Sequence, residues 1–94
     1  MHMSNMSDSV KDSIDLYVKV GCQPGGFLIA VLSNDLREAF ARADQENIAA
    51  MFEIVKYCWN EIPSECWGSP EKVNDWLTRD WMAIREAALT EKEL

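Results

Sequence analysis

Apolar residues recur every three or four positions along most of the chain, which is the spacing of one face of an α-helix. The first apolar stripe consists of Val10, Ile14, Tyr17 and Val18. It predicts a helix over residues 7–20. Ser7 or Ser9 can cap the start of this helix, and Gly21 can end it in the left-handed conformation.

A turn of Pro24-Gly25-Gly26 separates this helix from a second stripe. The second stripe consists of Phe27, Leu28, Val31, Leu32, Leu36, Ala39, Phe40 and Ala43. Either one helix runs from Gly26 to Ala43, or the helix breaks at Ser33-Asn34-Asp35 and restarts with Asp35 and Glu38 as a capping box. Because the stripe stays in phase across the polar residues, we favour a single helix.

Two further helices are predicted beyond residue 43. Asp44 is a candidate N-cap for the third, which must end before Pro63. Its stripe consists of Ile48, Met51, Phe52, Val55, Cys58, Trp59 and Ile62. The fourth begins at Ser69-Pro70-Glu71, a serine cap followed by proline at the first helical position. Its apolar residues are Val73, Trp76, Leu77, Trp81, Ile84 and Ala88.

The sequence therefore predicts an all-α fold, a small single-domain bundle of about four helices over residues 7–89. Residues 1–6 begin with Met1-His2-Met3, which is typical of a cloning remnant, and we expect them to be disordered. Residues 90–94 are expected to fray. We expect Trp59 and Trp76 to fill the core, whereas Trp67 lies in a loop and is either a lid over the core or a contact residue.

Charge narrows the choice of partners. Sixteen acidic and nine basic residues give a net charge of −7 and a pI near 4.5. This balance argues against direct binding to nucleic acid or to anionic membranes. The longest apolar run, residues 27–32, is too short to span a bilayer, and no export signal is evident. We therefore expect a cytosolic protein that contacts neither nucleic acid nor membrane.

Residue patterns typical of metal, redox or catalytic sites are scarce. The single histidine is His2, and Cys22, Cys58 and Cys66 match no zinc or redox spacing. We expect three reduced thiols, with Cys58 in the core and Cys66 accessible in a loop. The chain also lacks a phosphate-binding loop of Walker type and a nucleophile elbow. The sequence accordingly predicts no catalysis, no metal and no cofactor.

Polar residues at the predicted helix junctions are the candidate binding residues. They are Asn34, Asp35, Arg42 and Asp44, together with Tyr57 on the third helix. They either cap helices in a buried network, or they include a pocket for a polar ligand formed by Asn34, Arg42 and Tyr57. Gly25 and Gly26 either form a simple turn or present backbone N–H groups to an anion.

Several motifs also carry a resemblance. They are Pro24-Gly25-Gly26-Phe27-Leu28, Ala30-Val31-Leu32, Asn34-Asp35-Leu36, Arg42-Ala43-Asp44 and Cys66-Trp67-Gly68-Ser69-Pro70-Glu71-Lys72-Val73. Together they make roughly residues 14–77 resemble a group of small phage and prophage open reading frames with no settled activity. The resemblance implies a phage accessory protein that acts in a bacterial cytoplasm, and it transfers no catalytic residues.

Three functional hypotheses follow. The first is a non-catalytic inhibitor, similar in role to anti-CRISPR and other anti-defence proteins, that binds a bacterial host or defence protein through its acidic surface and Trp67. The second is an oligomeric sponge that sequesters a nucleotide-like defence signal with Gly25, Gly26, Arg42 and Tyr57. The third is a structural or assembly factor of the phage particle.

Overall fold

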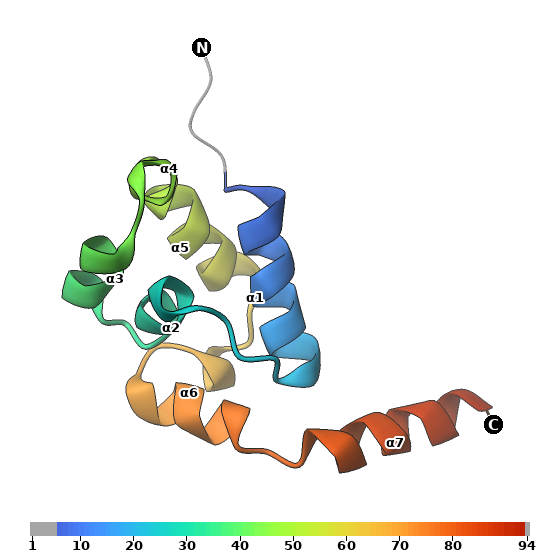
Figure 1. The fold of residues 1–94 in the computed structure, drawn as a ribbon. Coiled ribbons are helices and arrows are strands. Elements are labelled where there is room, and N and C mark those ends of the chain that lie inside the picture. Colours follow the sequence, from blue (N-terminus) through green and yellow to red (C-terminus); the bar gives the residue numbers. More distant parts are fainter. Residues whose placement is uncertain (1–5, 94) are drawn as a thin grey trace.

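The computed structural model describes the backbone of residues 6–93 and the side chains of residues 6–87. Within these residues the chain forms seven α-helices and one short 3₁₀ turn, with no strand (Figure 1). In order they are α1 (Asp8–Val20), α2 (Gly26–Leu32), α3 (Leu36–Arg42), α4 (Gln45–Ala49), α5 (Met51–Glu61), η1 (Ser64–Cys66), α6 (Pro70–Leu77) and α7 (Trp81–Glu93). The all-α prediction is confirmed, whereas the count of four helices is wrong.

The single helix favoured over residues 26–43 is also wrong, because the chain breaks at Asn34. Asn34 adopts the left-handed conformation with φ 62°, and the Asp35 N–H donates to the Ala30 carbonyl at 2.9 Å, which closes the end of α2. The side chain of Asp35 then accepts from the Glu38 N–H at 3.2 Å and starts α3. The capped break that we considered as the alternative is the observed structure.

The other two long helices are divided as well. Asp44 caps α4 as predicted, since its side chain accepts from the Asn47 N–H at 2.7 Å, but the backbone at Ala50 then departs from helical geometry and separates α4 from α5. The last predicted helix ends at Leu77. Asp80 starts α7 anew by accepting from the Ala83 N–H at 3.1 Å. The caps at Ser7 and Ser69, the left-handed stop at Gly21 and the end before Pro63 all agree with the prediction.

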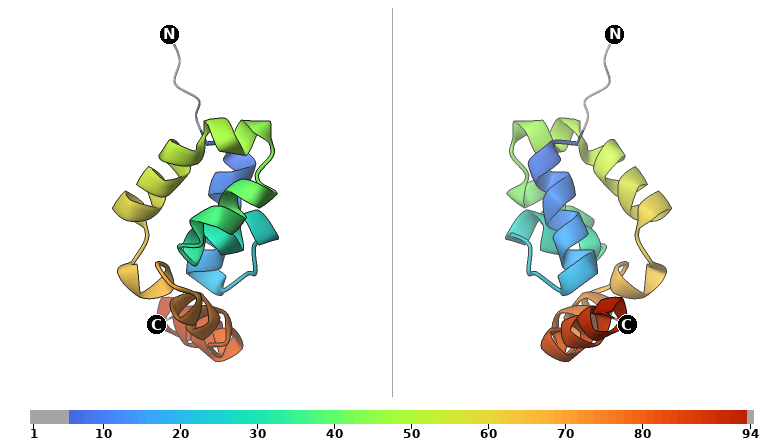
Figure 2. Two further views of the ribbon diagram at one scale, coloured as in Figure 1. Left: turned by 90° about the vertical axis from the view of Figure 1, so that its left-hand side faces the viewer. Right: turned by 90° about the vertical axis from the view of Figure 1, so that its right-hand side faces the viewer.

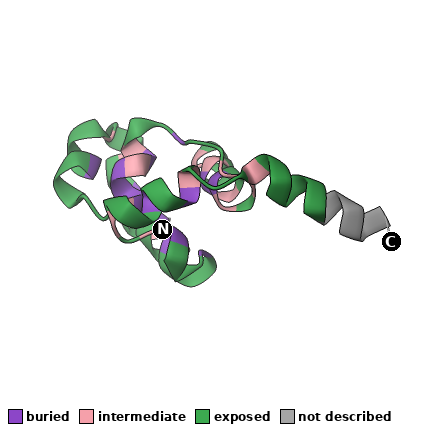
Figure 3. Cartoon of the chain, turned by 90° about the horizontal axis from the view of Figure 1, so that it is seen from below, coloured by how far each residue is buried: buried purple, intermediate pink, exposed green. Residues whose placement is uncertain are grey.

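The helices surround one small core. Figures 1 and 2 show α1, α2 and α5 grouped together, with α6 across one end and α7 pointing away from the rest. The fully buried side chains include Ile14 and Tyr17 of α1, Leu32 of α2, and Ile54 and Cys58 of α5. Trp76 is buried, as expected. Beyond its first residue, the described part of α7 is exposed (Figure 3).

Tyr17 joins α1 to the C-terminal third of the chain. Its side chain is fully buried, and its hydroxyl donates to the Cys66 carbonyl at 2.7 Å. The Tyr17 carbonyl in turn accepts from the indole Nε1 of Trp76 at 2.9 Å. Two hydrogen bonds from one residue therefore connect α1 to both η1 and α6.

A second indole holds the start of α7. Trp81 donates from Nε1 to the Trp76 carbonyl at 2.7 Å, and the two rings meet edge to face with centroids 5.2 Å apart. The Trp81 ring covers Gly21, where a Cβ atom would come within 1.9 Å of Nε1. Gly21 is thus required both for its φ of 68° and for the close approach of this ring.

Replacing Gly21 with alanine is expected to lower the free energy of unfolding by about 2 kcal/mol or more, because the left-handed backbone is strained and Trp81 loses its hydrogen bond. Urea unfolding followed by circular dichroism measures the change. Gly25→Ser is the control, since Gly25 has φ −68° and open space around it. Equal stability of G21A and the unmodified protein would contradict the role of Gly21.

Replacing Tyr17 with phenylalanine is expected to cost about 1–3 kcal/mol, because the buried Cys66 carbonyl loses the donor that the structure gives it. Tyr57→Phe is a matched control that removes a hydroxyl from a half-buried site, so its cost should be smaller. The same unfolding experiment compares the two variants. A larger loss for Y57F than for Y17F would count against the central position of Tyr17.

Candidate functional site

The polar residues singled out from the sequence fall into separate places. Gly26, Asp35 and Arg42 line one pocket of about 410 Å³. Tyr57 lines a different pocket of about 300 Å³ on α5, and Asn34 lines neither of these two. Asp44 caps α4, and Gly25 occupies the cap position of α2. The structure therefore does not bring Asn34, Arg42 and Tyr57 together into one pocket.

The pocket at Arg42 contains its own counter-charges. Arg42 Nε donates to Glu38 Oε2 at 2.8 Å, and Asp35 lines the same pocket. A Cβ atom at Gly26 would lie 3.0 Å from Arg42 Nη1, so the guanidinium passes close to the backbone at the start of α2. Two carboxylates beside one guanidinium make this pocket a poor site for an anion.

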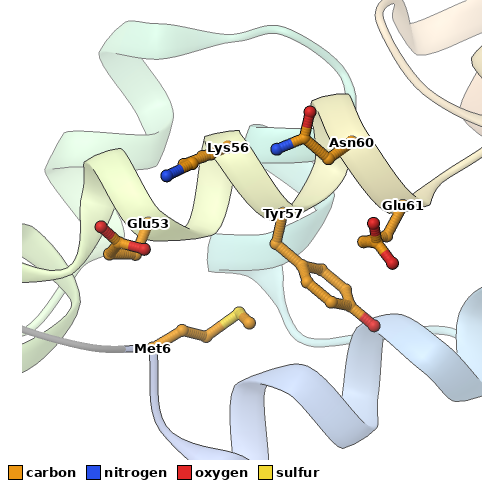
Figure 4. Close-up of a pocket in the computed structure, with 6 residues that line it drawn as sticks. All are labelled: Met6, Glu53, Lys56, Tyr57, Asn60 and Glu61. Carbon is orange, nitrogen blue, oxygen red and sulfur yellow. The ribbon is translucent and has the colours of Figure 1, made fainter.

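Tyr57 ties α5 to α1. Its hydroxyl donates to Asp15, and this bond raises the pKa of Tyr57 to about 12. Lys11 completes the arrangement, with Nζ 3.6 Å from Asp15 Oδ2 and 5.8 Å from the centroid of the Tyr57 ring. The pocket beside Tyr57 is also lined by Glu53 and Glu61 (Figure 4). At neutral pH Tyr57 is a protonated donor that links two helices.

The clearest surface feature lies on α5. The predicted stripe of its helix divides into two lines about 100° apart around the axis. Met51, Ile54 and Cys58 form the buried line, and Phe52, Val55 and Trp59 form the exposed line, with 67%, 40% and 78% of their surfaces accessible. The expectation that Trp59 belongs to the core is therefore wrong. The core therefore covers one of the two apolar lines of α5 and leaves the other exposed.

Helix α3 adds a second exposed line. Ala39 is buried, whereas Leu36 and Phe40 are 66% and 42% accessible. Leu36 and Val55, one from each exposed line, border the same narrow cavity, which we call the groove, and the two helices stand apart in the left view of Figure 2. We call this surface the α3–α5 face; it consists of Leu36, Phe40, Phe52, Val55 and Trp59.

Trp67 closes one end of the groove. Its neighbours are fixed, since the Cys66 carbonyl accepts from Tyr17 and the Gly68 N–H donates to the Leu32 carbonyl at 2.7 Å. Trp67 is half-buried, packs against the core and lines the cavity that also contains Leu36 and Val55. Trp67 covers the core with one side, as a lid would, and borders a surface cavity with the other, so its role as a contact residue stays a prediction.

A wider pocket of about 430 Å³ lies between Trp59 and Trp67. Asn34, Ile62, Ser64, Gly68 and Lys72 line the rest of it. Lys72 Nζ donates to the Ser64 carbonyl at 3.0 Å, which holds the ammonium group beside the two indoles. Sequence reasoning missed this pocket and the α3–α5 face. The available signal was the stripe of the third helix, which is wider than a single core contact requires.

The thiols are mostly withdrawn from solvent. Cys22 is exposed, whereas Cys58 and Cys66 are fully buried. The expectation that Cys66 is accessible is wrong, because η1 turns its side chain inward, where Sγ donates to the Pro63 carbonyl at 3.2 Å. Burial raises the pKa of Cys58 to about 12 and that of Cys66 to about 11.

Among the described residues, no group of three or more His, Cys, Asp or Glu side chains could hold a metal ion. No described helix is long and apolar enough to cross a membrane. Comparisons with protein-family models, with curated proteins and with solved structures find no match to this chain.

Thiol labelling checks the burial of the cysteines. At about pH 8 we expect iodoacetamide to modify Cys22 alone in the folded protein and all three cysteines after unfolding, because a protonated, buried thiol does not react. Rapid labelling of Cys66 in the folded protein would contradict its burial.

The raised pKa values of Cys58 and Cys66 also predict that the free energy of unfolding falls above about pH 9. There the unfolded thiols begin to ionise while the folded ones keep their protons.

Proposed function

We propose that this protein is a non-catalytic binding protein of phage type, which docks on a bacterial host or defence protein through the α3–α5 face and inhibits it by occlusion. One observation carries the proposal: five large apolar side chains on two neighbouring helices are 40–78% accessible. Leu36 and Val55, one on each helix, line a shared cavity, and exposed apolar patches are typical of protein-binding sites. Tryptophan is enriched among the residues that contribute most to binding energy, and Trp59 is the most exposed of the five.

The bacterial setting rests on the resemblance to phage open reading frames. Several residues of that resemblance have local structural roles. Asn34 ends α2, Asp44 starts α4 and Ser69 starts α6. The same motifs also include Leu36 and Trp67, which border the groove. The resemblance thus extends over part of the surface that we propose for docking.

The sponge hypothesis has less support. Its aromatic residue, Tyr57, lies in a different pocket from Arg42, and Arg42 is paired with Glu38. A nucleotide phosphate at Arg42 would also meet Asp35. These placements favour a protein partner over a free nucleotide for the residues considered.

Trp59→Ser should weaken partner binding by about 2 kcal/mol, a loss of roughly thirtyfold, because it removes the most exposed aromatic side chain of the face. Met82→Ser is the matched control, since Met82 is 71% accessible and lies on α7. Tagged proteins are used to capture partners from a bacterial host lysate at low and moderate salt, and the captured proteins are identified by mass spectrometry. A stoichiometric partner retained by M82S and lost by W59S is the expected result.

Three outcomes would count against the proposal. Retention of the same partner by W59S would exclude the α3–α5 face as the docking surface. A phage particle protein as the partner would instead favour an assembly factor. Co-purification of a small molecule with the protein, detected by native mass spectrometry in the absence of any protein partner, would favour the sponge.

A further inference from the structure

Basic residues lie beside the α3–α5 face, although the whole chain is acidic. On α3, Arg37 follows Leu36 and is offset by about 60° from Phe40 around the helix, on the side away from buried Ala39. On α5, Lys56 is offset by about 40° from Phe52, and its Nζ lies 5.9 Å from the centroid of the Phe52 ring. Lys72 lines the pocket at the end of the groove.

Acidic residues also lie on or next to these helices. Glu38 pairs with Arg42 in the pocket beside Gly26. Glu53 and Glu61 line the pocket beside Tyr57, which Lys56 also lines. Asp35 does line the groove, but its carboxylate accepts the Glu38 N–H at the start of α3. Of the described residues that line the pocket between Trp59 and Trp67, Lys72 alone is charged, so the local charge there is opposite in sign to the net charge of −7.

We propose that the α3–α5 face takes an acidic segment of a partner protein, with an aromatic side chain of that segment seated between Trp59 and Trp67. This inference rests on the proposed docking function and names the chemistry of the partner. Two indoles line a pocket of about 430 Å³, which offers ring contacts to an aromatic side chain. A carboxylate next to that side chain pairs with Lys72 or Lys56.

The Lys72 ammonium group is already held in place before such a segment binds. This group has three donors, and one of them is used by the Ser64 carbonyl. That hydrogen bond fixes the ammonium beside the pocket and leaves two N–H groups for an incoming carboxylate. Less side-chain freedom is then lost on binding than for an unrestrained lysine.

A second copy of the chain fits this face less well. A symmetric dimer would bring the same surface of both copies together. The basic residues beside the face of one copy would then lie across the interface from those of the other, and like charges across an interface are unfavourable. Complementary charge therefore favours an acidic segment from a different protein.

The test uses blocked tripeptides as probes and the indole N–H signals of the full chain, observed by ¹H–¹⁵N NMR. The probes are phenylalanine between two aspartates, phenylalanine between two lysines, and alanine between two aspartates. The first probe is expected to shift the signals of Trp59 and Trp67 and to leave buried Trp76 unchanged. The other two should bind at least several-fold more weakly. Lys72→Gln and Lys56→Gln should each lower affinity for the first probe by about two- to fivefold, and Lys19→Gln on α1 should not.

Several results would overturn this inference. They are unchanged Trp59 and Trp67 signals with every probe, equal binding of the lysine and aspartate peptides, and full affinity for the first probe in K56Q and K72Q. Stronger shifts of the same two signals by adenosine monophosphate would assign the pocket to a nucleotide. A dimer in sedimentation that W59S abolishes would assign the face to a second copy.

These failures differ from failure of the proposed function. A partner captured from lysate that is lost by W59S but bound equally by K56Q and K72Q would keep the docking function and refute the acidic segment. Binding of the first probe between Trp59 and Trp67, together with a partner that W59S still captures, would support the binding chemistry of this pocket and refute the docking function.

Discussion

The hydrogen bonds of Tyr17 are the interaction on which the rest of the structure depends. A buried hydroxyl is costly without a partner, and Tyr17 meets this requirement with the Cys66 carbonyl, 49 residues away in sequence. The connection from α5 to α6 contains only the short turn η1, so its position comes from such contacts and not from helix packing. Trp67 directly follows Cys66. The bond that fixes η1 to α1 therefore also fixes one wall of the pocket beside Trp59.

The exposed face follows from the small size of the core. A domain of 94 residues has little apolar volume, and alanines occupy several of its closest contacts, namely Ala30 of α2, Ala39 of α3 and Ala50 before α5. Such a core covers the line of Met51, Ile54 and Cys58 on α5 and extends no further around the helix. The adjacent line of Phe52, Val55 and Trp59 is apolar beyond what folding uses. Its composition is therefore explained better by a contact outside the chain.

Local signals in the sequence were sufficient for helix type and for many boundaries. Ser69-Pro70, Asp44 and Gly21 act through their own backbone geometry, so each could be placed without knowledge of the fold. The break at Asn34 could be recognised only as an alternative, because apolar phase continues across it. Burial was harder to predict. Periodicity puts Cys58 and Trp59 on one broad face of a helix, but the partner helices decide which of the two they cover. The inward turn of Cys66 combines the local turn η1 and its bond to Pro63 with the long-range bond from Tyr17, which the sequence alone does not reveal.

The contrast between net and local charge has a consequence for how such a face would work. The net charge of −7 repels an acidic partner at long range, whereas Lys56 and Lys72 attract it at contact. Salt at physiological strength screens charges beyond about 8 Å and affects close pairs less. Added salt therefore weakens the repulsion from the remote carboxylates more than it weakens the lysine contacts. These two effects change the affinity in opposite directions, so the affinity depends less on salt concentration. An inhibitor that docked on a basic groove through dispersed carboxylates would lack this compensation, because salt would weaken both its approach and its contacts.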